Sequence, residues 1–160
     1  MPAFYFEKGK DMSNFEKTLE NLNDYLINNK EEYEVSRKID SSGFVIIESV
    51  QDLTCFITCD VTDRCKCLSL AIHPCITCLN SEKEQLRKYF EEINNMFYSG
   101  QLLLNSEGAI YIQVSQKYID APLSVETISF MFLELYSILE FVLPQIKEIV
   151  YKSNTICYDT

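Results

Sequence analysis

The residues that could carry chemistry are concentrated between positions 55 and 78, where six cysteines accompany the single histidine of the chain: Cys55, Cys59, Cys65, Cys67, His73, Cys75 and Cys78. Cys75 and Cys78 form a C-x2-C pair of the kind that zinc sites use. A hairpin that turns about Thr62 places Cys59 opposite Cys65, with Cβ atoms about 5 Å apart. One hypothesis is therefore a zinc- or thiol-dependent structural or sensory module, with zinc on Cys65, Cys67, Cys75 and Cys78.

The same cysteines also fit a structural interpretation. Cys55, Ile57 and Cys59 alternate as the buried face of a strand does, and a free cysteine packs as a small hydrophobic residue. Seven cysteines are an odd number in a chain large enough to build its own core, which favours reduced thiols over a disulfide framework. We prefer buried, reduced thiols, with no cofactor, and keep zinc binding and redox pairing as alternatives.

Catalysis has little support in the sequence. His73 precedes Pro74 at the end of a predicted strand, and a Cys-His nucleophile pair would need a third, orienting group. The sequence shows neither that group nor an oxyanion-donating loop nor a glycine-rich phosphate loop. We predict no catalytic residues and no enzymatic activity.

A second candidate site lies on the predicted C-terminal helix, from about Ser124 to Lys152. Its apolar residues share one arc, but Phe130, Leu133 and Phe141 fall on the opposite, charged arc. Another part of the same chain could cover them, or they could form a client or homodimer interface, which is the interpretation we favour. Burying two phenylalanines and one leucine would contribute about 4 to 8 kcal/mol before the entropic cost of association.

Charge and hydropathy exclude several classes of partner. With 24 acidic and 14 basic residues the net charge is −10, which disfavours binding to nucleic acid or to an anionic membrane surface. The most apolar run, residues 125–143, contains Glu126, Glu134 and Glu140, and a central carboxylate costs about 2.5 to 3.5 kcal/mol in a bilayer. The N-terminus does not read as a signal peptide. We therefore expect a cytoplasmic protein whose partners are proteins.

Periodicity predicts the elements that position these residues. Capping boxes at Ser13–Glu16 and Ser81–Glu84 begin two helices, and Gly100 is expected to end the second one. Residues 33–73 read as two hairpins, and residues 101–115 as a third hairpin with a Ser-Glu-Gly turn. Pro144 should bend the last helix without breaking it, because the apolar arc keeps its phase across it.

The order helix, four strands, helix, two strands, helix predicts one α+β domain over residues 1–160. We expect an antiparallel sheet of about five to six strands with three packed helices. Residues 13–152 form the predicted core, and the sequence leaves open whether residues 1–12 are flexible or pack onto it.

The residues also suggest a family. The run Ile93–Leu104, followed by Ser106–Ile110, resembles the "N-x-x-x-x-G-x-hydrophobic, turn, strand" core of YbjN-type domains, which share the fold of type III secretion chaperones. Leu139–Ile146 is similar to the aromatic and proline segment of that family's last helix. The resemblance implies a non-enzymatic protein, because secretion chaperones of this fold are small acidic homodimers that hold an extended client segment, and YbjN-type domains are labelled regulators.

Overall fold

The computed structural model describes residues 11–29, 34–37 and 42–156, so most of the N-terminal segment, residues 1–10, lies outside the described residues. The described residues form three helices and six strands in the predicted order: α1 (Asn14–Asn28), β1 (Glu34–Arg37), β2 (Gly43–Val50), β3 (Leu53–Thr62), β4 (Cys67–Pro74), α2 (Asn80–Asn94), β5 (Gly100–Leu104), β6 (Ile110–Lys117) and α3 (Val125–Ile156). All neighbouring strands are antiparallel, and the sheet order is β1-β2-β3-β4-β6-β5. The predicted α+β architecture is confirmed.

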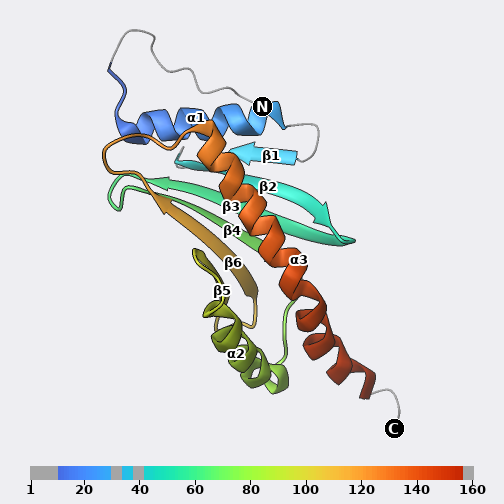
Figure 1. The fold of residues 1–160 in the computed structure, drawn as a ribbon. Helices are drawn as coiled ribbons and strands as arrows, with labels where there is room; N and C mark the ends of the chain where they lie inside the picture. The colour runs from blue at the N-terminus through green and yellow to red at the C-terminus, as the bar shows by residue number, and fades with distance from the viewer. Residues whose placement is uncertain (1–10, 30–33, 38–41, 157–160) are drawn as a thin grey trace.

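The core lies between one face of the sheet and the helices. Figure 1 shows α3 crossing the sheet diagonally, with α1 near one end of the crossing and α2 near the other. Alternate strand residues point into this layer and are buried, among them Cys55, Ile57, Cys59, Leu68, Leu70, Ile72, Ile112 and Val114. The intervening residues of the same strands are only half-buried or exposed. The sheet is thus covered on one face, and that face gives the strands their period of two.

The starts of the helices follow the capping rules only in part. Ser13 and Glu16 form the predicted capping box of α1. The box predicted at Ser81 and Glu84 is wrong, because α2 begins at Asn80 after Leu79, and no side chain caps it. The cap position therefore falls on an apolar residue, and Ser81 lies inside the first turn of the helix.

Gly100 has a different role from the predicted helix stop. Helix α2 already ends at Asn94, and Gly100 is the first residue of β5. A Cβ atom at this position would lie 2.1 Å from Cδ1 of Ile138 on α3. The glycine therefore allows α3 to approach the sheet closely, which is a packing requirement that local sequence does not reveal.

The third hairpin is confirmed in detail. Asn105 Oδ1 accepts hydrogen bonds from the amides of Glu107 (2.9 Å) and Ala109 (2.8 Å). Gly108 has a φ of 85°, a left-handed conformation that glycine adopts without steric cost. The Ser-Glu-Gly turn therefore joins β5 to β6 as predicted.

Helix α3 is continuous through Pro144, as its constant apolar phase predicts. Its start is tied to α1, because the Leu123 amide donates to Thr18 Oγ1 at 3.1 Å and the Asn21 side chain donates to the Leu123 carbonyl at 2.7 Å. Ser124 caps the helix by accepting from the Thr127 amide at 3.1 Å. These contacts fix the rotation of α3, and therefore decide which of its residues face away from the sheet.

Candidate interaction surface

The outer face of α3, which we define as Phe130, Leu133 and Phe141, is exposed to solvent. The exposed fractions of the three side chains are 62%, 61% and 59%. Neighbouring residues on the inner arc, such as Phe132 and Leu135, are fully buried. The structure thus places these three residues outside, as the helical phase predicts, and their contact with a partner stays a prediction.

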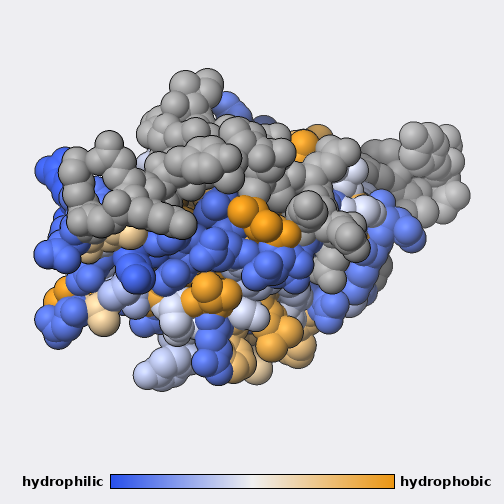
Figure 2. All heavy atoms as spheres, turned by 90° about the horizontal axis from the view of Figure 1, so that it is seen from above, coloured by the Kyte–Doolittle hydropathy of each residue, from blue (hydrophilic) through white to orange (hydrophobic). Residues whose placement is uncertain are grey.

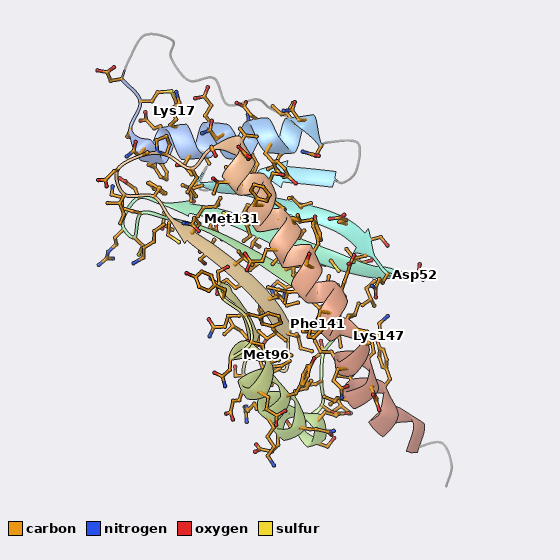
Figure 3. All side chains as sticks on the ribbon, viewed as in Figure 1. Lys17, Asp52, Met96, Met131, Phe141 and Lys147 are labelled. Atoms are coloured by element: carbon orange, nitrogen blue, oxygen red, sulfur yellow. The ribbon has the colours of Figure 1, made fainter. Side chains whose placement is uncertain are left out.

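The connection between α2 and β5 extends this apolar surface. The rings of Phe97 and Phe141 meet edge to face with centroids 6.3 Å apart, and Met96 is 70% exposed. Figure 3 shows Phe141 on the side of α3 that faces this connection, near Met96. The Ser99 hydroxyl donates to Glu134 at 2.5 Å and ties the connection to α3. The helix predicted from Ser81 to Gly100 would include Met96 and Phe97, whereas α2 ends at Asn94, so the prediction missed their part in this surface.

Apolar side chains are exposed on the side of the molecule where α3 lies. In Figure 2, several apolar residues lie on the lower side of the view, the side on which α3 lies over the sheet in Figure 1, with hydrophilic residues beside them. Isolated exposed hydrophobic residues are normal, whereas grouped ones mark interaction sites. The outer face of α3 is therefore the leading candidate for a binding surface.

One edge of the sheet is closed to strand pairing. The Asn94 side chain accepts from the Leu102 amide at 2.7 Å and donates to the Leu102 carbonyl at 3.0 Å. These two bonds occupy the outward-facing backbone groups in the middle of β5, which an added strand would otherwise use. Binding by strand addition at β5 would require Asn94 to move away.

The cysteines do not assemble into the zinc site that the sequence analysis kept as an alternative. In the β3–β4 hairpin Thr62 pairs with Cys67, so Cys59 lies opposite Leu70, and its predicted pairing with Cys65 is wrong. Cys67 begins the eight-residue strand β4 and Cys75 follows its other end, so the length of the strand, about 23 Å, separates them. Among the residues that the structure describes, no group of three or more His, Cys, Asp or Glu side chains is placed to hold a metal ion.

The described cysteines differ strongly in solvent exposure, and only some of them are buried as the structural interpretation predicts. Cys55, Cys59 and Cys78 are buried, Cys67 is half-buried, and Cys65 and Cys75 are exposed. Burial raises the pKa of Cys55 to about 11, with smaller contributions from the nearby Cys75 and Glu48 charges. Burial also raises the pKa of Cys78. The Cys55 and Cys78 thiols are therefore protonated and unreactive near neutral pH.

His73 lies on the open face of the sheet, beside a shallow pocket of about 420 Å³ lined by Phe56, His73, Pro74, Cys75, Ile76, Thr77 and Ala109. Its ring meets Tyr111 edge to face, and burial lowers the pKa of its imidazole. None of the described residues that line the pocket is a carboxylate that could orient the imidazole. The Cys-His pair considered from sequence therefore shares a mainly apolar pocket that lacks the rest of a catalytic arrangement.

One buried group could not be foreseen from the sequence. Glu82, in the first turn of α2, is 1% exposed, and neither carboxylate oxygen has a hydrogen-bond partner. Sequence periodicity gives a glutamate in a charged run a solvated position, so Glu82 would be assigned to the surface. Its burial follows from the start of α2 at Asn80, which turns this position toward the core.

Helix α3 also satisfies a simple test for membrane spans. Residues Val125–Tyr151 are long and apolar enough to cross a bilayer, yet 44% of the most apolar window is buried inside the protein. A helix that packs one face against a sheet passes the same test of length and composition. These properties therefore do not assign α3 to a membrane.

Comparison with known proteins supports the fold. The structure is similar to a chain in "Crystal Structure of the ExsC-ExsE Complex", with a TM-score of 0.55 and 12% sequence identity over 82% of this chain and 94% of that chain. No protein-family model and no curated protein matches the sequence. The likeness shows a secretion chaperone-like fold, whereas membership of the YbjN-type domains stays a prediction.

Proposed function

We propose that this chain is a cytoplasmic, non-enzymatic protein-binding domain, with a chaperone-like or regulatory role, that holds a partner polypeptide on the outer face of α3. The observation that carries the proposal is the exposure of Phe130, Leu133 and Phe141, at 62%, 61% and 59%, on one arc of a long helix. Solvation of three such side chains is unfavourable, and a partner that covers them gains the corresponding hydrophobic free energy.

The fold supports this proposal by analogy. The similar chain was solved in a complex that its title names ExsC-ExsE. A shared fold does not by itself transfer a function, so the surface of this chain has to carry the argument. The outer face of α3 does so, because it offers apolar area on a rigid helix that is anchored to the sheet along its other side.

We also propose that the protein acts as a homodimer, as the resemblance to secretion chaperones implies. Light scattering of the purified protein should then give about twice the 18.6 kDa of one chain. A mass of one chain at all working concentrations would reject the dimer and leave the protein-binding proposal standing.

Capture from the native cytoplasm tests the binding surface directly. The tagged protein should retain a stoichiometric polypeptide that Phe130→Glu with Phe141→Glu loses, because two carboxylates in the contact cannot be desolvated without large cost. Leu79→Glu with Ile119→Glu is the matched control, since these side chains are 61% and 72% exposed but lie outside α3.

Both double variants should melt at the temperature of the unmodified protein, because all four substituted side chains are largely exposed. Retention of the same polypeptide by both variants would reject α3 as the surface. Failure of every form to retain a polypeptide would contradict the protein-binding proposal itself.

A further inference from the structure

The outer face of α3 is apolar at its centre and acidic around it. At about 100° per residue, Glu126, Glu134 and Glu148 lie within about 40° of Phe130 around the helix axis, and Glu140 lies at about 80°. Glu126, Glu140 and Glu148 are exposed, and Glu134 is half-buried beside Ser99. From Val125 to Glu140, the part of α3 that carries Phe130 and Leu133, there is no base; Lys147 falls about 100° from Phe130 around the axis, and Lys152, in the last turns of the helix, falls about 40° from it.

We infer that the polypeptide held on this face is a cationic amphipathic segment, with apolar side chains between lysine or arginine residues. The inference rests on the proposed function and specifies the chemistry of its partner. Apolar side chains of the segment would cover Phe130, Leu133 and Phe141, while its bases would meet the surrounding carboxylates. Charges at the rim of an interface contribute mainly to selection and to the rate of encounter, so they decide which apolar segment binds.

The same charges argue against a second copy of the chain on this face. Two outer faces brought together would place two sets of four glutamates around one contact, on chains that each carry a net charge of −10. Juxtaposed like charges oppose association. A homodimer of this protein would therefore use another surface, and the outer face of α3 would stay accessible in it.

A synthetic peptide supplies the test. The probe is a short fluorescent peptide of leucine and lysine, patterned as an amphipathic helix, and its counterpart carries glutamate in place of every lysine. Fluorescence anisotropy should show that the lysine peptide binds, that added salt weakens its binding, and that the glutamate peptide does not bind. Phe130→Ser, Leu133→Ser and Phe141→Ser together should abolish binding of the lysine peptide.

A matched pair of charge variants separates the rim of α3 from the overall charge. Glu126→Gln with Glu140→Gln removes two exposed carboxylates from the rim, and Glu84→Gln with Glu91→Gln removes two from the exposed side of α2. The first pair should weaken binding of the lysine peptide about fivefold, and the second less than twofold, because each exposed ion pair contributes only modestly.

Several outcomes would overturn the inference. Equal binding of the two peptides, no binding of the lysine peptide, or an equal effect of the two charge variants would each do so. Light scattering of the unmodified protein and of the triple serine variant gives a further test. If the unmodified protein is a dimer and the variant is a monomer, a second copy of the chain occupies the face. Except where a second copy occupies the face, a polypeptide that the unmodified protein retains and that Phe130→Glu with Phe141→Glu loses would still support the proposed function.

Discussion

Both faces of α3 carry phenylalanine and leucine residues, and these residues have opposite environments on the two faces. Phe132 and Leu135 on the inner face are fully buried, whereas Phe130 and Leu133, two residues earlier in each case, are about 60% exposed. Because residue type is the same, position around the helix axis alone decides between core and surface. The inner face of α3 therefore contributes to stability through burial, whereas the outer face contributes little to the stability of a single chain.

Truncation of one phenylalanine on each face tests this division most strongly. Phe132→Ala should lower the free energy of unfolding by about 3 to 5 kcal/mol, because it removes a buried ring and leaves a cavity. The lost ring also stacks on Tyr25 of α1, with centroids 4.7 Å apart. Phe130→Ala should change the free energy of unfolding by less than about 0.5 kcal/mol. Urea denaturation of the two variants measures both values.

A large loss of stability in Phe130→Ala would contradict the division between the two faces, because it would mean that the ring is covered in solution. Repeating the denaturation at several protein concentrations then identifies what covers the Phe130 ring. A loss that depends on protein concentration points to another copy, and a loss that does not points to the chain itself.

The division between the faces of α3 could be predicted from sequence, whereas the cysteine site could not. Helical phase depends on one segment only, so Phe130 and Phe141 are placed correctly without knowledge of the rest of the chain. The pairing of Cys59 depends on where β3 turns, and burial of Val61 extends that strand to Thr62. The turn therefore lies at residues 63–66 instead of about Thr62 as predicted, and Cys59 faces Leu70 instead of Cys65.

The remaining differences have the same origin in tertiary contacts. In its local sequence Gly100 resembles a residue that ends a helix, but it is the first residue of β5. The close approach of Ile138 explains why this residue is a glycine. Glu82 reads as a solvated residue of a charged helix, and only the packing of α2 on the body buries it. Local rules predict the elements and their order, and contacts between distant segments decide the register and the ends.

The Cys55 thiol, in the sheet beneath α3, should make stability depend on pH. Cys55 faces the covered layer, and its burial, followed by the Cys75 and Glu48 charges, raises the pKa of its thiol from 9.0 to about 11. Between these pH values the unfolded chain releases the proton and the folded chain keeps it. Stability from this group is therefore complete below pH 9 and falls as pH rises toward 11, by about 2 kcal/mol in total.

Urea denaturation across this pH range measures the effect. Cys55→Val should remove about 2 kcal/mol of the decline in the free energy of unfolding, while Cys75→Ser, at an exposed position, should leave most of it. Burial also raises the pKa values of Cys78, Tyr89 and Tyr118, so a decline of smaller slope should persist in the valine variant. Identical slopes in the valine variant and the unmodified protein would show that Cys55 is not the titrating group.

The smallest effect concerns the contact that holds the inner face of α3 against β5. Gly100→Ala should lower the free energy of unfolding by about 1 to 2 kcal/mol, because the new Cβ would lie 2.1 Å from Cδ1 of the buried Ile138. Ile138→Val removes that methyl group, and should itself cost about 0.5 to 1.5 kcal/mol. In the valine background the alanine should fill the vacated space, so its cost should largely disappear.

A double-mutant cycle by urea denaturation should therefore give a coupling of about 1 kcal/mol between positions 100 and 138. The control is the same glycine substitution combined with Phe130→Ala, which lies eight residues before Ile138 on the outer face of α3. That pair should be additive, because the Phe130 ring is exposed and is distant along the helix from the contact with Gly100. Additivity at both pairs would mean that the glycine is needed for the strand itself, and that the distance between α3 and the sheet is set by other contacts.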